Sequence, residues 1–244
     1  MESKTSNRVK TETVTISVAD GTEMQMHSAF PEGKEKAPGL MLFQEMFGVN
    51  KHIKDLVELF AREGFVTVAP ELYHRTAPPG FGTEYDAESR AKANAHREAL
   101  TLDQLRDDIR AVHAWLLEND RVDANKIGSI GYCMGGKVSF LASETVELKA
   151  AVSYYGGGIA KDLLGDIENI HAPLLLVWGG ADANIPRADR TKILEALDGA
   201  RKRYANIEFS DAGHGFACDE RESYHKEATE YAQMLSLSFL GTHL

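Results

Sequence analysis

Hydrophobic and polar residues follow two different patterns along this chain. Near its start, residues 13–18 and 24–29 favour β-strands and flank Ala19-Asp20-Gly21-Thr22. An Asp-Gly pair between two such segments is typical of a tight turn between antiparallel strands. We therefore predict an antiparallel N-terminal hairpin, preceded by a polar tail at residues 1–12.

After the hairpin, short apolar runs alternate with stretches of helical periodicity. The runs predict buried strands at residues 39–43, 65–69, 126–131, 150–154, 174–178 and 204–210. Helices are predicted at residues 53–60, 86–119, 134–146, 187–197 and 220–240. Repeated strand–helix alternation indicates an α/β fold with a mostly parallel, doubly wound sheet, whose site is built by loops at the carboxyl ends of the strands. The irregular loop at residues 75–85 lies where a lid over those ends is expected.

Composition limits the number of domains and the class of partner. The chain has 244 residues, of which 43% are hydrophobic, and this supports a single domain, residues 13–244. Its net charge of −10, from 27 basic and 37 acidic residues, argues against a nucleic acid or an anionic membrane as the main partner. We expect a small-molecule ligand and a monomer or weak homo-oligomer.

The N-terminal residues, the length of the apolar runs and the number of cysteines predict the cellular compartment. Residues 1–13 are polar and lack the apolar core of a secretory signal, and no apolar run is long enough to span a bilayer. We expect a cytoplasmic protein. The two cysteines, Cys133 and Cys218, suit a reducing compartment without a structural disulfide.

Candidate chemistry begins at Gly131-Tyr132-Cys133-Met134-Gly135, between a predicted strand and a predicted helix. This pattern is typical of the nucleophile elbow of the α/β-hydrolase fold, with sulfur in place of the usual serine oxygen. The nucleophile lies on a tight turn, so side chains two positions before and after it would collide with the neighbouring backbone, and glycine avoids this. Cys133 is therefore the candidate nucleophile.

Two alternatives to this interpretation start from the same residues. Gly131, Gly136 and Lys137 also match a phosphate-binding loop, but Val138 stands where Ser or Thr would bind magnesium, so nucleotide hydrolysis is disfavoured. Cys133 could also be a small buried core residue, as free cysteines often are.

A thiol needs a base and a carboxylate to act as a nucleophile. His214 lies between two glycines in Ala212-Gly213-His214-Gly215-Phe216, a loop after the last predicted strand, and is our candidate base. Asp182 follows the strand at residues 174–178 and completes the order nucleophile, acid, base that is expected of this fold. Asp182 could instead cap the next helix, and Asp189 and Asp211 are rivals for its role.

A further carboxylate, Glu45, directly follows the strand at residues 39–43. In this fold that strand end contributes to the oxyanion hole, so we predict the backbone amides of Met46 and Met134 as its two donors. Glu45 would then face the nucleophile, although a salt bridge with a nearby arginine is the alternative interpretation.

Together these residues resemble the dienelactone hydrolase (carboxymethylenebutenolidase) family. The resemblance extends from about residue 20 to residue 239 and is carried by Gln44-Glu45-Met46-Phe47-Gly48-Val49-Asn50, Pro70-Glu71-Leu72-Tyr73, Gly131-Tyr132-Cys133-Met134-Gly135-Gly136, Tyr154-Tyr155-Gly156, Gly179-Gly180-Ala181-Asp182 and Ala212-Gly213-His214-Gly215-Phe216. It implies a carboxylic ester hydrolase that cleaves a small lactone or ester through a thioester intermediate.

The resemblance also implies the roles of individual residues. It assigns a triad of Cys133, Asp182 and His214, with Glu45 as an auxiliary carboxylate that contacts the thiol in the resting state and responds to substrate. It implies no metal and no organic cofactor.

Departures from the family pattern concern the substrate. The family carries an arginine shortly after the catalytic histidine, where it holds a substrate carboxylate, and this chain has Cys218 at that place. Arg221 could compensate from the next turn. Without one such clamp, binding would weaken by about 1.5–3 kcal/mol, so dienelactone itself is not the expected preferred substrate.

The family's second substrate-binding arginine matches Arg90 by position, with Arg75 and Arg97 as competitors. From loop position we further expect three aromatic residues, Phe47, Phe81 and Tyr155, to line the acyl pocket. Cys218 also raises the hypothesis of a second thiol that resolves an oxidised Cys133.

Two other functions remain open from the sequence. One is a broad carboxylesterase or thioesterase with the same machinery. The other is a hydrolase fold that binds a small ligand without turnover, which the complete set of nucleophile, acid and base disfavours.

Overall fold

The computed structural model describes residues 8–33 and 36–244, and within them eight strands form one sheet. The strands are β1 (Val9–Ser17), β2 (Glu23–Pro31), β3 (Ala37–Phe43), β4 (Val66–Pro70), β5 (Val122–Tyr132), β6 (Ala150–Tyr154), β7 (Leu174–Gly179) and β8 (Tyr204–Phe209). Their order is β1-β2-β4-β3-β5-β6-β7-β8. Strand β2 is antiparallel to both of its neighbours, and every pair from β4 to β8 is parallel. This confirms the predicted α/β-hydrolase fold with its antiparallel N-terminal hairpin.

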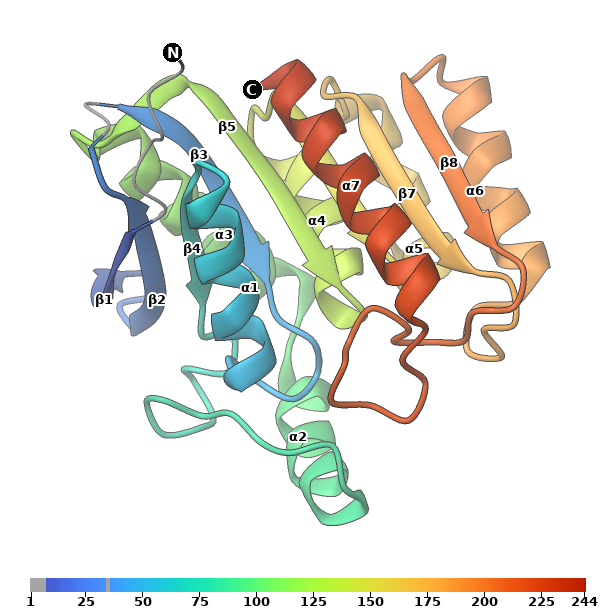
Figure 1. Ribbon diagram of the computed structural model, residues 1–244, viewed down its shortest axis with the longest axis horizontal. Coiled ribbons are helices and arrows are strands. Elements are labelled where there is room, and N and C mark those ends of the chain that lie inside the picture. Colours follow the sequence, from blue (N-terminus) through green and yellow to red (C-terminus); the bar gives the residue numbers. More distant parts are fainter. Residues whose placement is uncertain (1–7, 34–35) are drawn as a thin grey trace.

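Helices cover both faces of the sheet (Figure 1). They are α1 (Lys51–Arg62), α2 (Ala87–Ala99), α3 (Leu102–Glu118), α4 (Met134–Thr145), α5 (Ile159–Asp162), α6 (Arg187–Gly199) and α7 (Lys226–His243), together with a 3-10 turn, η1 (Leu164–Asn169). Helices α1 and α7 lie in front of the sheet in Figure 1, and α3 and α4 lie behind it. The connections from β5 through α4 to β6 and from β7 through α6 to β8 run across the sheet in the same direction. Because connections between parallel strands are right-handed, α4 and α6 lie on the same face of the sheet.

The first strand begins earlier than the sequence predicted. Residues 9–12, assigned to a polar tail, belong to β1 and pair with β2 from Val9 opposite Pro31. The polar residues Lys10 and Glu12 are tolerated because Lys10 is exposed and Glu12 pairs with Arg121 at 2.8 Å. The remainder of the predicted tail, residues 1–7, lies outside the described residues.

Two predicted helices have different limits in the structure. The helix expected at residues 86–119 is divided into α2 and α3, because Thr101 caps a new helix through a reciprocal capping box with Gln104. The helix expected from residue 220 starts at Lys226, where the His225 side chain accepts a hydrogen bond from the Ala228 amide. The six residues in between belong to a loop.

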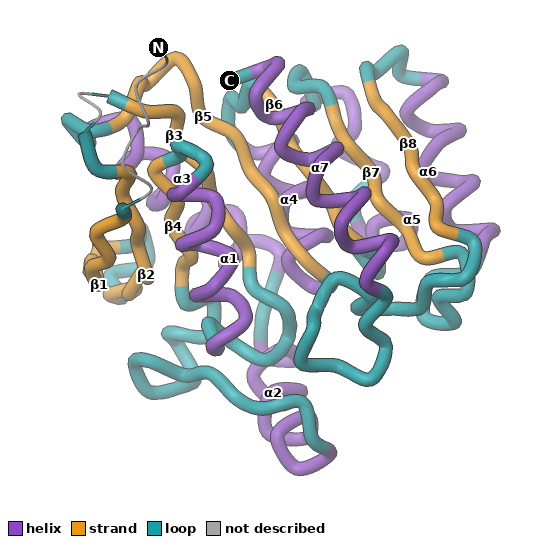
Figure 2. Tube along the Cα trace, in the orientation of Figure 1, coloured by secondary structure: helices purple, strands orange, loops and turns teal. Residues whose placement is uncertain are grey.

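The carboxyl ends of the parallel strands gather the long loops at one edge of the molecule. Figure 2 shows the loops before α2 and before α7 side by side at this edge, and α2 projects from it. Strands β3, β4, β6 and β7 are almost fully buried. Their side chains therefore form the core, and their ends provide a rigid base for a site. Among the described residues, no helix combines the length and the apolar character needed to cross a membrane.

Candidate active site

Strand β5 passes into helix α4 through the predicted elbow at Cys133. Its backbone angles, φ 57° and ψ −116°, are rarely adopted by residues other than glycine. A Cβ atom on Gly131 would overlap the carbonyl group of Gly135, and one on Gly135 would overlap the carbonyl group of Phe43. The two glycines therefore allow the strand, the turn and the helix to meet at this distance.

The structure brings the three predicted triad side chains together. His214 Nε2 lies 3.1 Å from Cys133 Sγ, and His214 Nδ1 lies 2.7 Å from Asp182 Oδ2. The other oxygen of Asp182 accepts a hydrogen bond from the Asn184 amide at 2.8 Å. A continuous chain of hydrogen bonds therefore joins the carboxylate to the thiol.

This environment makes His214 a strong base. Burial alone would lower the pKa of His214, but its hydrogen bonds to Asp182 and Cys133 outweigh this effect and raise the pKa to about 10. Since the Asp182 carboxylate is 5% exposed, solvent screens its charge little. An imidazole held in this way can accept the proton of a thiol.

The loops that carry Asp182 and His214 are in direct contact. The Ala181 amide donates a hydrogen bond to the Ala212 carbonyl at 3.0 Å, and a Cβ atom on Gly179 would overlap that same carbonyl. The rival carboxylates have other partners: Asp189 lies 3.6 Å from Lys192, and Asp211 lies 3.3 Å from His225. Of the three acidic candidates, Asp182 is the one bound to His214.

The predicted oxyanion-hole residues, Met46 and Met134, line one cavity with Cys133. Met134 is the first residue of α4, where backbone N–H groups have no acceptor within the helix. The Tyr73 hydroxyl donates to the Met46 carbonyl at 2.8 Å and lies 3.4 Å from Met134 Sδ. Tyr73 thus links the loop after β3 to the start of α4.

Glu45 is fully buried, and both of its oxygens have partners. Arg221 Nη1 donates to Oε1 at 2.9 Å, and the Tyr85 hydroxyl donates to Oε2 at 3.0 Å. The resemblance implied a resting contact between Glu45 and the thiol. In this structure the Cys133 thiol lies against His214 instead, and Glu45 forms the salt bridge of the alternative interpretation.

Positive charge surrounds the cavity at Cys133. The cavity has a volume of about 1000 Å³, and its ionised lining groups are one carboxylate, Asp162, and five cations: Arg90, Arg97, Lys137, Lys161 and Arg221. Lys137, considered above as part of a phosphate loop, pairs with Asp162 at 2.5 Å. The cations within this cavity favour an anionic ligand, while the adjoining hollow that shares Arg90, His214 and Arg221 is also lined by four carboxylates: Glu84, Asp86, Glu220 and Glu222.

Two predicted substrate-binding residues lie elsewhere. The Arg75 guanidinium binds Asp108 at 2.8 and 3.0 Å and Asp20 at 2.6 Å, and Arg75 is not among the residues that line the cavity. Tyr155 is fully buried, and its ring centre lies 5.2 Å from that of His214, so Tyr155 packs against the imidazole. The predictions for Arg75 and Tyr155 do not agree with these positions.

Of the two other aromatic residues expected to line the pocket, one reaches the cavity and the other does not. Phe47 lines the cavity and lies between Tyr85, whose ring is 4.6 Å away, and the guanidinium of Arg90, at 5.6 Å. Phe81 packs on Tyr73 instead, with ring centres 5.9 Å apart. Of the predicted substrate contacts, Phe47 and Arg90 therefore reach the cavity, and so does Arg97, the competitor of Arg90.

Three residues near the cavity were missed or undervalued from sequence. Arg221 was considered only as compensation for Cys218, yet it lines the cavity and is held by Glu45. A Cβ atom on Gly215 would overlap its guanidinium, so Gly215, beside His214, leaves the space that Arg221 occupies. Tyr85, in a loop, and Lys161, in the short helix α5, carried no signal, because nothing in their local sequence indicates which way the side chain points.

Comparisons with known proteins find relatives over nearly the whole chain. Residues 24–244 match the model of the Dienelactone hydrolase family. A protein of Synechocystis sp. is 33% identical over 227 residues, which cover 90% of this chain and 92% of its own. A carboxymethylenebutenolidase of Pseudomonas putida is 30% identical over 231 residues and covers 95% of this chain and 96% of its own. A crystal structure from Klebsiella pneumoniae superposes with a TM-score of 0.86 at 28% identity, covering 96% of this chain and 99% of that one.

Proposed function

Since the chain belongs to the dienelactone hydrolase family, whose members are hydrolases of esters and lactones, we propose that Cys133 is the nucleophile of such a hydrolase. The observation that carries this proposal is the unbroken chain from Asp182 through His214 to Cys133, which ends at a cavity wall. The substrate is a small lactone or ester.

The reaction follows from the positions of the donors and acceptors. His214 Nε2 takes the thiol proton, and Cys133 Sγ forms a bond to the carbonyl carbon, whose oxygen becomes an anion stabilised by the amides of Met46 and Met134. The carbon–oxygen ester bond then breaks, and His214 returns the proton to the leaving alkoxide. A thioester remains on Cys133.

Water completes the cycle with the same groups. His214 removes a proton from a water molecule, whose oxygen attacks the thioester carbon, and the carbon–sulfur bond breaks. The products are a carboxylic acid and the restored thiol. Asp182 stabilises the imidazolium at each stage, because its carboxylate accepts a hydrogen bond from the Nδ1–H group.

Arg221 and Arg90 support an anionic substrate. Both line the cavity and lie near the ring of Phe47, at 5.9 and 5.6 Å. An arginine–carboxylate pair contributes about 1.5–3 kcal/mol to binding. Although Cys218 occupies the family's arginine position, Arg221 restores a cation, so a lactone or ester that carries a carboxylate is again a suitable substrate.

Binding of a substrate carboxylate at Arg221 also affects Glu45. A substrate carboxylate at Arg221 competes with Glu45 for the guanidinium, and it therefore releases Glu45 from its partner. Glu45 then becomes available to the active site only when a ligand is bound, in keeping with the auxiliary role that the family resemblance implies.

Hydrolysis of p-nitrophenyl acetate and of a small unsaturated lactone tests the proposal. We expect activity in the wild type and none above background in Cys133→Ala, while Cys133→Ser tests whether oxygen can replace sulfur. Equal activity in all three proteins would exclude Cys133 as the nucleophile. The ratio of lactone to ester turnover separates a lactonase from a general esterase.

A further inference from the structure

The cavity at Cys133 is larger than a small lactone requires. Its volume, about 1000 Å³, is at the upper end of the range of about 300–1,000 Å³ that holds drug-sized ligands. Arg90 and Arg221 both lie near the ring of Phe47, so a substrate carboxylate bound there occupies one part of this space. A second part is therefore open to the rest of the substrate.

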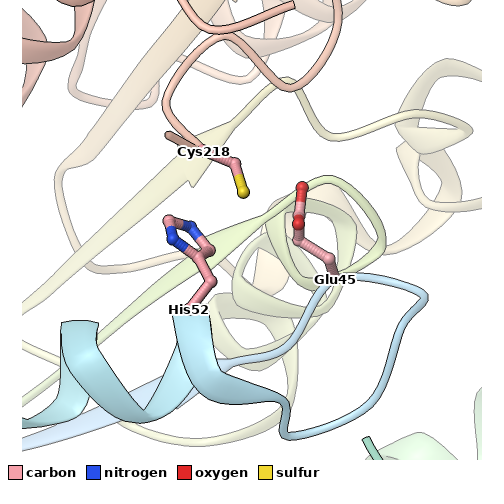
Figure 3. Close-up of side chains that lie close together, drawn as sticks. All are labelled: Glu45, His52 and Cys218. Carbon is pink, nitrogen blue, oxygen red and sulfur yellow. The ribbon is translucent and has the colours of Figure 1, made fainter. Parts of the chain in front are cut away.

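The space beyond Arg221 is closed by buried side chains. Glu45, which binds Arg221, lies close to His52 and Cys218, and all three are buried. Figure 3 shows these side chains pointing toward one another, and one polar or sulfur atom of each lies within 4.8 Å of the others. None of them lines the cavity. A substrate cannot extend in this direction without displacing them.

An apolar arm of the cavity offers more room. We use this name for the part lined by Ala87, Ala91, Leu100, Leu102, Leu105 and Val138, which come from α2, the α2–α3 junction, α3 and α4. Leu100 and Leu102 pack against the core but remain partly exposed. The alanines have short side chains, so α2 leaves the arm open. A ligand that covers these apolar surfaces removes them from water, which favours binding.

The cations near the arm do not exclude an apolar ligand. Lys137 is paired with Asp162. Arg97 and Lys161 are exposed, so their charged ends can stay in water while their apolar stems cover the arm. The arm therefore differs from the part of the cavity near Phe47, where two guanidinium groups suit a carboxylate.

His214 determines which part of the substrate lies in the arm. It returns its proton to the leaving oxygen, so the leaving group lies beside His214, where the adjoining hollow opens. None of the three leucines of the arm lines that hollow. The acyl group stays bonded to Cys133, whose carbonyl accepts a hydrogen bond from the Lys137 amide at 3.4 Å, and Val138 follows in the same turn of α4. The arm therefore begins beside the acyl group.

On the basis of the proposed function, we propose that the apolar arm binds the acyl group of the substrate and that this group is an apolar chain longer than acetyl. Ala91 and Leu102 determine how long a chain the arm accepts, because they line it from two different helices. The substrate class is then an ester or lactone of a medium-chain acid.

Two isomeric esters test which side of the ester bond carries the chain. Ethyl hexanoate and hexyl acetate contain the same atoms, but the first has the chain in its acyl group and the second in its alcohol. We expect kcat/KM for ethyl hexanoate to be at least ~10-fold higher, since each buried methylene group contributes about fourfold. Titration of the released acid at constant pH measures both. Equal values, a preference for hexyl acetate, or no hydrolysis of either ester would overturn the proposal.

Three tryptophan variants locate the arm. Ala91→Trp and Leu102→Trp fill it from different helices, and each should bring the kcat/KM values of the two isomers close to each other. Ala95→Trp adds the same side chain at an exposed position of α2 that does not line the cavity, and it should keep the wild-type preference. Far-ultraviolet circular dichroism shows that each variant is folded. An unchanged preference in either folded arm variant would overturn the proposal.

Hydrolysis of p-nitrophenyl acetate separates this proposal from the proposed function. Hydrolysis that depends on Cys133, together with no preference between the two isomers, would overturn the role of the arm alone. Hydrolysis that persists in Cys133→Ala would overturn the proposed function.

Discussion

Cys133 has backbone angles that side-chain-bearing residues rarely adopt, and the residues on both sides make this conformation possible. A positive φ of this kind costs about 1–3 kcal/mol, which the packing of β5 against α4 has to offset. Gly131 and Gly135 allow that packing, because any larger residue would overlap a neighbouring carbonyl group. The glycine pattern reports a steric requirement, and for this reason the elbow could be predicted from sequence.

Asp182 sets the basicity of His214, and its replacement should change the pH profile. Asp182→Asn removes the carboxylate that raises the pKa of His214 to about 10. Hydrolysis of an alkyl ester needs the imidazolium to protonate the leaving group, so wild-type activity should fall as the pH rises through about 10. In the variant this alkaline limb should move to lower pH, and kcat should fall by about 10²–10⁴.

Steady-state kinetics from neutral to alkaline pH measure this shift, with enzyme stability at each pH as the control. An alkaline limb at the same pH in both proteins would mean that another group controls it.

The sequence predicted which side chains meet at Cys133 better than it predicted which ones reach the cavity. Cys133, Asp182 and His214 each follow a strand in a loop containing glycine, so backbone position alone brings them to one edge of the sheet. The side chains of Arg75 and Arg221 are long, and their directions depend on carboxylates distant in the sequence. Spacing along the chain contains no information about such partners.

At the scale of elements, Arg75 ties the loop after β4 to helix α3. Its partner Asp108 is fully buried in that helix, and the guanidinium compensates the carboxylate through two hydrogen bonds. Arg75→Met should lower the free energy of unfolding by about 3–5 kcal/mol, because it leaves a buried charge without this partner. Urea denaturation measures the loss.

The same variant distinguishes a structural role from the substrate-binding role that the sequence suggested. We expect KM for a carboxylate-bearing ester to stay unchanged in the folded Arg75→Met protein. A large increase in KM at unchanged stability would support contact with substrate.

Helix α4 also carries the buried carboxyl group of Glu144, which has no hydrogen-bond partner among the described residues. Burial, and then the charge of Asp166, raise its pKa to about 8, and it lies in the last helical turn, where negative charge is unfavourable. A carboxyl whose pKa is raised on folding contributes stability below its ordinary pKa and loses it as the pH rises. Wild-type stability should therefore decline between about pH 4.5 and 8 from this group.

Glu144→Gln should remove that decline. We expect equal stability of the two proteins near pH 4.5, and an advantage for the variant of about 1–3 kcal/mol above about pH 8. Thermal unfolding at several pH values measures the difference. An advantage of the same size at all pH values would attribute the effect to packing and not to ionisation.

Element types were predictable where the pattern was strong, and element ends were not. Parallel strands buried on both faces produce continuous apolar runs, which identified β3, β4, β6 and β7, whereas β8 is a partly exposed edge strand. Helix ends depend on single capping residues. Thr101 and Gln104 form the box that divides α2 from α3, a signal present in the sequence but hidden within a continuous helical periodicity.

At the scale of the whole molecule, an acidic chain surrounds a cationic cavity. The Debye length at 0.1 M salt is about 10 Å, so a ligand in the cavity is affected by the charges that line it more than by the distant charges that make up the net charge of −10. Raising the salt from about 0.05 to about 0.5 M should increase KM several-fold for an anionic ester and leave KM of a neutral ester nearly unchanged. Equal effects on both esters would argue against an electrostatic role of the cavity.

The elbow also determines when the protein can become active during its synthesis. Gly135 packs on the carbonyl of Phe43, and His214 arrives only with the loop that follows the last strand. Contacts between such distant segments form late and slow folding down. A nascent chain whose Cys133 has left the ribosome therefore lacks the contact with His214, which forms only after the strands of the sheet have been synthesised. Enzymatic activity is consequently a direct reporter of complete folding.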